Sequence, residues 1–249
     1  GIATRANGRE GKECVVHCGG NALPRRRAQL SCAAGDASTP STPQFLSDAQ
    51  ESWGDLGLGE KTSRCLNALG FRTPSKIQSL ALPSVISGRD AVIAAETGSG
   101  KTVAYLAPVL DKLVQRDLGG DEEHRHRSAQ IALVLCPNAP LCKQVASVAR
   151  DLVDGFGSTP ADVSVLDLSS PGEGGSVDVE ACMAHGGNLL MVSTPAAFLG
   201  RFYDSDEGSF DGSVGHLGGS VFSLVKFLVL DEVDMLLCGG FQRATTYLV

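Results

Sequence analysis

The sequence predicts an α/β domain in which a mostly parallel β-sheet is covered by helices on both faces. Five short apolar segments indicate buried strands, and helical patterns separate them along the chain: 91–95, 131–136, 163–168, 189–193 and 226–230. Apolar strands that alternate with helices are typical of parallel sheets, because both faces of such a sheet are buried. The length of 249 residues suffices for one such domain with tails.

Residues 1–45 are expected to lie outside this domain. They are rich in Arg, Ala, Ser, Gly and Pro and show no sustained hydrophobic periodicity, so they offer little apolar surface to bury. We therefore expect a basic, disordered leader of low order. Two interpretations stay open: the tail of an organellar transit segment, or an ordinary disordered tail.

The charge is distributed unevenly along the chain. The formal net charge is −7, but residues 1–35 carry six Lys or Arg and only two Glu, which leaves 15 basic and 26 acidic residues in the rest. A domain that acidic does not attract nucleic acid through its overall field, so any RNA or DNA contact has to be local or shared with another, basic domain. No apolar run is long enough to span a membrane, and none is predicted to do so.

Eight cysteines are scattered along the chain, at positions 14, 18, 32, 65, 136, 142, 182 and 238. Several lie in apolar segments: Cys136 ends a predicted strand, and Cys238 follows two leucines. We interpret them as small buried thiols of a protein in a reducing compartment. Cys14, His17 and Cys18 are followed by no second ligand pair at zinc spacing, so no metal site is predicted there.

Two helices are predicted before the first strand. The segment 60–69 places Leu66 and Leu69 on one helical face, and Gly70 stops it. Pro74 opens the second helix, whose apolar positions include Ile77, Leu80 and Leu82. Later helical patterns cover 103–113, 141–152 and 196–202.

The strand 91–95 runs into a Gly- and Ser-rich turn and then an amphipathic helix, which is the arrangement of a phosphate-binding loop. Gly98 and Gly100 allow successive backbone N–H groups to point into one anion-binding concavity, and the helix N-terminus adds its positive dipole end. Lys101 is placed to reach the outer phosphates, and Thr102 to ligate Mg²⁺. Ala95 stands where such loops often have their first glycine. The predicted phosphate-binding residues are Ala95, Glu96, Thr97, Gly98, Ser99, Gly100, Lys101 and Thr102.

The last predicted strand ends in acidic residues. In open α/β sheets, chemistry collects at the carboxyl ends of the strands. Asp231 is placed to hold Mg²⁺ directly or through water, because Mg²⁺ prefers hard oxygen ligands. Glu232 is placed to orient or deprotonate a water that attacks the γ-phosphate, in a reaction that depends mostly on positioning and charge neutralisation. The predicted catalytic residues are Lys101, Asp231 and Glu232, and the predicted metal ligands are Thr102 and Asp231.

Together these segments resemble the first RecA-like domain of the DEAD-box RNA helicases. Residues 70–78 (GFRTPSKIQ) are similar to the adenine-reading Q motif of that family, residues 95–102 match motif I, and residues 231–234 match motif II, with Val233 in place of the usual Ala. The resemblance covers about residues 50–249 and implies a RecA-like P-loop fold. Nothing in the chain matches the family's SAT segment or its second RecA-like domain, so we expect this domain to be incomplete at its C-terminus.

The resemblance also implies a cofactor and further site residues. The cofactors would be ATP and Mg²⁺, and the Gln78 amide would pair with the adenine edge. Trp53 stands where the family carries an upstream aromatic, and Asp234 would couple to neighbouring loops. The additional cofactor-binding residues implied in this way are Trp53, Phe71, Pro74, Gln78 and Asp234.

Two segments depart from the family pattern where its members contact the RNA backbone. The family usually has PTRELA-x-Q where this chain has PNAPLCKQ at 137–144, so that Ala139 replaces an Arg. It usually has TPGR where this chain has TPAA at 194–197. Because two guanidinium groups are lost, we expect weaker or more restricted RNA binding, through backbone N–H groups, Asn138 and Thr194. The contacts expected are with the RNA backbone and independent of base sequence.

We expect ATP-dependent RNA remodelling by the complete protein and little activity from this chain alone, because the family takes part of its site from the second RecA-like domain. The alternative is a nucleotide-dependent RNA clamp or scaffold that unwinds little. A P-loop nucleotide kinase is disfavoured, since a Q motif has no task there and no Arg-rich lid is present. We expect a monomer. The altered segments and the basic leader resemble plant organellar members of the family, which favours a chloroplast or other organelle over the cytoplasm or nucleus.

Overall fold

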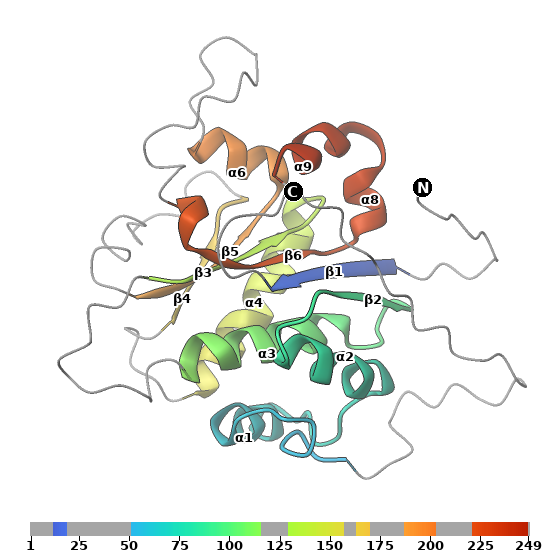
Figure 1. Cartoon of the computed structure of the whole chain (residues 1–249), viewed down its shortest axis with the longest axis vertical. Coiled ribbons are helices and arrows are strands. Elements are labelled where there is room, and N and C mark those ends of the chain that lie inside the picture. The colour runs from blue at the N-terminus through green and yellow to red at the C-terminus, as the bar shows by residue number, and fades with distance from the viewer. Residues whose placement is uncertain are drawn as a thin grey trace, which may run out of the picture.

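A computed structural model of the chain describes residues 12–18, 51–115, 129–156, 163–169, 187–202 and 221–248. Within these ranges one six-stranded sheet has the order β2-β1-β6-β3-β5-β4 (Figure 1). Its strands are β1 (Lys12–Cys18), β2 (Ala91–Ala95), β3 (Ile131–Leu135), β4 (Val163–Asp167), β5 (Asn188–Ser193) and β6 (Val225–Leu230). The five predicted strands are all present, with ends that differ from the prediction by no more than one residue.

Four neighbouring strands, β6, β3, β5 and β4, run parallel. Their side chains alternate between two cores, as the pleat of a strand requires. In β3, Ala132 and Val134 point into one hydrophobic core, whereas Ile131, Leu133 and Leu135 point into the other. The sheet is therefore buried on both faces, and the predicted α/β architecture is confirmed.

Strand β1 comes from the segment that the sequence analysis excluded from the domain. It lies between β2 and β6 and is antiparallel to both, with Val16 opposite Ala91 on one side and opposite Val229 on the other. The segment KECVVHC contains two adjacent β-branched residues, which favour a strand. Its place in the sheet depends on partners 75 or more residues away, which local composition does not reveal.

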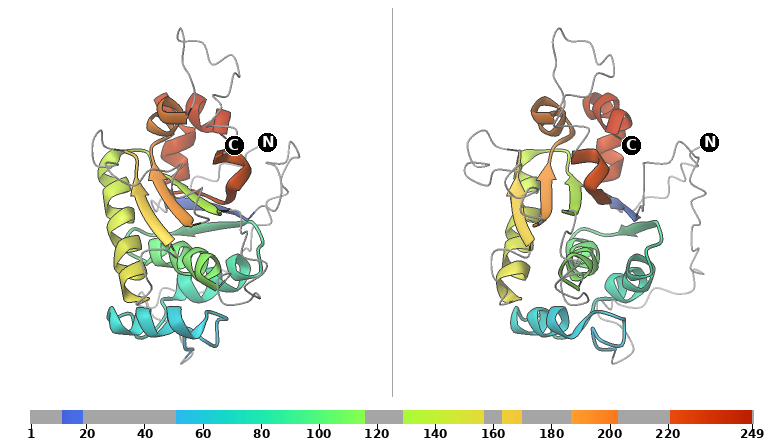
Figure 2. Two further views of the ribbon diagram at one scale, coloured as in Figure 1. Left: turned by 90° about the vertical axis from the view of Figure 1, so that its left-hand side faces the viewer. Right: turned by 60° about the vertical axis from the view of Figure 1, so that its left-hand side comes forward.

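The helices described by the structure form layers on the two faces of the sheet (Figures 1 and 2). Helices α2, α3 and α4 pack on one face, and α6, α8 and α9 on the other. Their bounds are α1 (Glu60–Ala68), α2 (Lys76–Ile86), α3 (Lys101–Gln115), α4 (Ala139–Gly155), α6 (Pro195–Phe202), α8 (Val233–Leu237), the 3₁₀-helix η3 (Gly239–Phe241) and α9 (Gln242–Leu248). None of these helices combines the length and apolar character needed to cross a bilayer.

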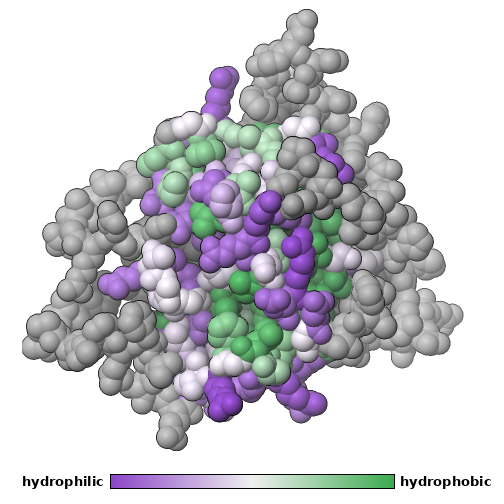
Figure 3. All heavy atoms as spheres, turned by 180° about the vertical axis from the view of Figure 1, so that it is seen from behind, coloured by the Kyte–Doolittle hydropathy of each residue, from purple (hydrophilic) through white to green (hydrophobic). Residues whose placement is uncertain are grey.

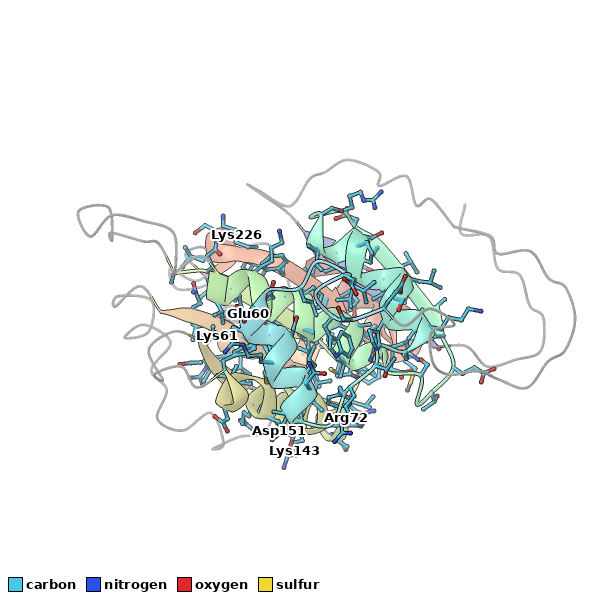
Figure 4. The ribbon with its side chains drawn as sticks, turned by 90° about the horizontal axis from the view of Figure 1, so that it is seen from below. Glu60, Lys61, Arg72, Lys143, Asp151 and Lys226 are labelled. Atoms are coloured by element: carbon cyan, nitrogen blue, oxygen red, sulfur yellow. The ribbon has the colours of Figure 1, made fainter. Side chains whose placement is uncertain are left out.

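Helix α1 forms an outer layer below α3 and α4 in Figure 1, and lies in front of them in Figure 4, where the molecule is seen from below. Thr62 donates a buried hydrogen bond to the Asp111 carboxylate of α3, and the Cys65 thiol donates to the Leu152 carbonyl of α4, at 3.3 Å. The helix ends as predicted: Gly70 has a φ of 91°, the left-handed conformation that glycine adopts freely. Leu69, which was predicted on the apolar face, is nevertheless 40% exposed.

The described residues on the face shown in Figure 3 mix hydrophilic and apolar side chains. Leu80, one of the apolar positions predicted in the second helix, is 67% exposed, whereas Leu82 on the same helix is fully buried. The large apolar side chains exposed among the described residues are Leu69, Phe71, Leu80, Val92, Met235, Leu237 and Phe241.

Three of the cysteines in the described part of the chain are buried, as predicted: Cys65, Cys136 and Cys142. Cys238 is exposed, so its predicted burial was wrong, because the end of the short helix α8 faces outward. Burial raises the pKa of the Cys65 thiol, while a hydrogen bond with Cys136 lowers the pKa of Cys142. The described residues contain no cluster of three metal-ligating side chains.

Candidate nucleotide site

The turn after β2 has the backbone of a phosphate-binding loop. Gly98 and Gly100 have φ values of 83° and 93°, which residues with a Cβ rarely adopt. Helix α3 begins directly after them at Lys101, so its N-terminus faces the loop. The Ser99 hydroxyl oxygen is buried in the loop and has no hydrogen-bond partner among the described residues. The loop therefore combines a buried, unpartnered hydroxyl with a helix N-terminus, and anion binding by it stays a prediction.

Lys101 lies within this loop instead of extending into solvent. Its ammonium donates to the carbonyls of Ala95 and Glu96, at 2.7 and 3.0 Å, and the residue is only 8% exposed. An anion above the loop would offer this ammonium a charged acceptor, which makes a stronger hydrogen bond than a carbonyl. The structure thus shows Lys101 held against the backbone of the loop, and its contact with phosphates stays a prediction.

The segment read as a Q motif is joined to the loop by two hydrogen bonds. The Gln78 Nε2 group donates to the Gly100 carbonyl at 3.1 Å, and the Ser75 hydroxyl donates to the Ser99 carbonyl at 2.8 Å. The other end of the Gln78 amide accepts from the Ser75 backbone N–H at 2.7 Å, as the N3 residue of a capping box does. Gln78 is 4% exposed. The structure therefore shows Gln78 connecting α2 to the phosphate loop, a role that the sequence analysis did not assign.

The other residues that the family resemblance places near the adenine of the nucleotide differ in their exposure to solvent. Trp53 is 1% exposed, and its indole N–H donates to the Phe71 carbonyl at 2.7 Å. Phe71 is 40% exposed, and Pro74 is buried. Trp53 thus fixes the backbone beside Phe71, while Phe71 presents a ring to solvent.

The acidic residues follow β6 at the carboxyl edge of the sheet. Asp231 and Glu232 are each 7% exposed, whereas Asp234 is exposed. The Asp231 backbone N–H donates to the Leu135 carbonyl at the end of β3, 2.9 Å away, which holds the strand end in place. Glu232 has a φ of 53° and a ψ of 50°, a left-handed conformation that is uncommon for a residue with a Cβ. Such backbone strain in a buried acid is typical of functional positions.

A long-range hydrogen bond joins the loop and the acidic strand end. The Tyr105 hydroxyl donates to Asp231 Oδ2 at 2.9 Å, in a fully buried contact. Tyr105 lies one helical turn after Thr102 on α3, so both side chains project from the same side of the helix. The structure therefore brings Asp231 to the first turns of the loop helix. The sequence did not single out Tyr105, because an aromatic residue on the apolar face of an amphipathic helix is expected to be part of the hydrophobic core.

The donors at this place suit a magnesium ion bound beside a nucleotide. Asp231 supplies a carboxylate and Thr102 a hydroxyl, both hard oxygen ligands of the kind that Mg²⁺ prefers. A carboxylate has about four acceptor sites, so an oxygen that accepts one hydrogen bond can also bind a metal ion. Asp231 and Thr102 are therefore chemically suited to the magnesium ion that the sequence predicts.

Asn138 and Thr194, predicted to contact RNA, cap helices at the carboxyl ends of two adjacent strands. Asn138 precedes α4, and its side-chain oxygen accepts from the Leu141 backbone N–H at 3.0 Å. Thr194 precedes α6 and accepts from the Ala197 backbone N–H at 3.2 Å. The N-termini of α4 and α6 thus lie at the carboxyl ends of the parallel strands, where Asp231 also lies.

Fold and site together define a P-loop α/β domain. The model of the DEAD/DEAH box helicase family matches residues 75–249, and the chain belongs to this family. It is 34% identical to DEAD-box ATP-dependent RNA helicase 22 of Arabidopsis thaliana over 227 residues, which are 90% of this chain and 36% of that relative. It is also 34% identical to DEAD-box ATP-dependent RNA helicase 22 of Oryza sativa subsp. japonica over 209 residues, 82% of this chain and 33% of that one. The chain thus spans about a third of the length of these relatives.

Comparison with solved structures confirms that this chain has the RecA-like fold. The DEAD-box helicase Mss116, solved bound to ssRNA and UDP-BeF, superposes with a TM-score of 0.57 at 19% identity, covering 80% of this chain and 36% of that one. The RNA helicase Prp28 from Chaetomium thermophilum, solved bound to ADP, gives a TM-score of 0.51 at 22% identity, covering 81% and 43%.

Proposed function

We propose that this chain supplies the ATP-binding domain of an ATP-dependent RNA helicase. The observation that carries the proposal is the buried contact between the loop helix and the acidic strand end, from Tyr105 to Asp231. It brings an anion-binding loop and a carboxylate to one place, which is what binding of a nucleotide with its magnesium requires. Family membership supports ATP as the nucleotide.

In this proposal each residue has one task. Backbone N–H groups of the loop and Lys101 bind the phosphates, while Thr102 and Asp231 would hold Mg²⁺, which neutralises phosphate charge. Glu232 orients or deprotonates the attacking water. Phe71 is exposed beside the segment that joins α2 to the loop and would contact the base. Gln78 holds α2 against the loop through both ends of its amide, and would pair with the base edge through its second N–H and its second oxygen lone pair.

RNA would bind at the carboxyl edge of the sheet, at the N-termini of α4 and α6. Backbone N–H groups at helix N-termini bind phosphate without reading sequence. Ala139 and Ala197 stand in the two segments that lack the usual guanidinium groups, so these contacts would be weaker than in a typical relative. A monomeric state and an organellar location stay predictions.

The altered segments favour a second candidate, a nucleotide-dependent RNA clamp that unwinds little. Clamping needs ATP and RNA binding, but strand separation needs strong contacts to one RNA strand. A strand-displacement assay on the complete protein separates the two. ATP-dependent release of a duplexed strand supports the helicase, and ATP-dependent RNA binding without release supports the clamp.

The test of the enzymatic part is Glu232→Gln in the complete protein. We expect RNA-stimulated ATP hydrolysis to fall at least 100-fold, because general-base catalysis contributes about 10²- to 10⁴-fold. ATP affinity should stay within about twofold, because the amide keeps the size of the side chain. Hydrolysis is measured by phosphate release and binding by calorimetry. Undiminished RNA-stimulated hydrolysis would remove Glu232 from the proposed role.

A further inference from the structure

We propose that Tyr105 is a positioning residue of the nucleotide site, whose hydroxyl holds the Asp231 carboxylate in the orientation that binds Mg²⁺. The inference rests on the proposed function, because it concerns the magnesium that would accompany the bound nucleotide. It adds Tyr105 to a site otherwise built from the loop, the first turn of helix α3 and the strand end.

Both oxygens of Asp231 are oriented by hydrogen bonds. Oδ2 accepts from the Tyr105 hydroxyl at 2.9 Å, and Oδ1 accepts from the Glu232 backbone N–H at 3.0 Å. The first bond comes from 126 residues away in the sequence, and Tyr105 is fully buried among core side chains. The rigid Tyr105 ring thus sets the position of Oδ2, and the Glu232 backbone N–H sets the position of Oδ1.

A fixed carboxylate binds a metal ion better than a mobile one, because less side-chain freedom is lost on binding. Hydrogen-bond partners of metal ligands set this orientation in metal sites generally, and their removal typically weakens metal binding or activity 10- to 100-fold. Tyr105 is well placed for this task, one helical turn from Thr102, the other proposed ligand. One face of α3 would then supply a ligand and the residue that orients the second ligand.

A plain structural role for the hydroxyl is the competing explanation, since buried tyrosines usually find a hydrogen-bond partner. The two explanations differ in what they predict for magnesium. A structural hydroxyl affects only the stability of the fold. A positioning hydroxyl also affects how much Mg²⁺ is needed to tighten nucleotide binding.

The experiment measures ADP binding to the whole chain by calorimetry while MgCl₂ is varied, with EDTA as the metal-free reference. Tyr105→Phe removes the hydroxyl and keeps the ring. Thr62→Val is the matched control, because it also removes a buried hydroxyl that donates to an aspartate, Asp111 on the same helix, but at the α1 interface. Thermal unfolding is recorded for all three proteins.

We expect Tyr105→Phe to raise the half-saturating Mg²⁺ concentration by about 10-fold, at the lower end of the effect of such partners. Its ADP affinity in EDTA should stay within twofold, and Thr62→Val should leave both quantities unchanged. A Tyr105→Phe protein with an unshifted magnesium dependence overturns the inference while leaving the proposed function intact. Failure of the unmutated chain to bind ADP overturns both.

If Tyr105→Phe does not fold, the unmutated chain labelled with 3-fluorotyrosine gives the answer by fluorine NMR. The chain has three tyrosines, and Tyr203→Phe and Tyr247→Phe assign the other two resonances. The Tyr105 resonance should shift when Mg²⁺ is added to the ADP-bound chain. No shift at saturating Mg²⁺ overturns the inference.

Discussion

Helix α2 approaches the phosphate loop closely at Gly100. A Cβ placed there would lie 2.5 Å from Gln78 Nε2 and 3.3 Å from the Ser75 hydroxyl. The Gly100 carbonyl accepts the Gln78 hydrogen bond at 3.1 Å, so the close approach and the bond belong to one contact. The residue therefore needs to be glycine for two reasons, its φ of 93° and the space that Gln78 occupies.

Gly100→Ala should destabilise the chain by about 1–3 kcal/mol, the usual cost of a strained backbone conformation. It should also weaken ADP binding, because Gln78 and the loop have to separate. Gly200→Ala is the control, since a Cβ at that helical position meets nothing within 4 Å. Urea unfolding and calorimetry measure the two effects. A Gly100→Ala protein as stable as the control would contradict this account of the loop.

Residue types predicted the phosphate loop, but they did not predict how its side chains are held. The string GSGKT indicated an anion site because glycines and a lysine follow a strand. The structure confirms the strand, the turn and the helix, while anion binding stays a prediction. Nothing local predicts that Lys101 donates to the Ala95 carbonyl, or that Tyr105 reaches Asp231. Such contacts depend on which elements meet in the folded chain.

At the scale of elements, β1 separates the two strands that carry the site. Neighbouring strands lie about 4.8 Å apart, so β1 sets the ends of β2 and β6 roughly 10 Å from each other. In the proposed site, phosphates and a metal ion would bridge this distance between the loop and Asp231. A segment that the sequence analysis placed outside the domain thus contributes to the geometry of the site.

Val16→Pro tests the contribution of β1. The residue is paired on both sides, with Ala91 and Val229, and proline removes a backbone donor from this interior strand. We expect a loss of about 1–3 kcal/mol, the cost of a buried hydrogen bond left unmade, and a melting temperature lower by several degrees. Ala33→Pro, outside β1, is the control. Equal melting temperatures for both variants would show that β1 does not stabilise the sheet.

The elements that the sequence predicted share a strong local signal, and those that it missed do not. Strand β3 is an uninterrupted apolar run, and β5 has four apolar residues between Asn188 and Ser193; both strands are buried along their whole length. The short helices α8 and α9 were missed because α8 has only five residues, too few to show a period. Strand β1 was missed because its partners are distant in the sequence.

At the scale of the whole molecule, the carboxyl ends of the strands bring the candidate site residues together on an acidic domain. Asp231, Asn138 and Thr194 follow three adjacent strands, β6, β3 and β5. With a net charge of −7, the chain does not attract RNA over long distances, so the helix N-termini at this edge would have to bind phosphate locally. The salt dependence of RNA binding should therefore be shallow.

Restoring the missing guanidinium groups should steepen that dependence. For Ala139→Arg together with Ala197→Arg we expect the slope of log K against log salt to become steeper by about 1.4, since each contact with single-stranded nucleic acid adds about 0.7. Ser147→Arg, on the exposed side of α4, controls for added charge alone. Filter binding of an oligoribonucleotide between low and moderate salt measures the slope. A slope of the unmutated complete protein as steep as that of a relative with both arginines would refute weakened phosphate contact.

The central claim, that the loop near Lys101 and the carboxylate of Asp231 hold a single nucleotide–magnesium unit, is tested most directly by calorimetry of ATP binding. The unmutated chain and Asp231→Asn are each titrated in Mg²⁺ and in EDTA. We predict that Mg²⁺ tightens ATP binding to the unmutated chain and that Asp231→Asn loses this tightening while keeping its affinity in EDTA. Equal tightening of both proteins by Mg²⁺ would contradict the claim.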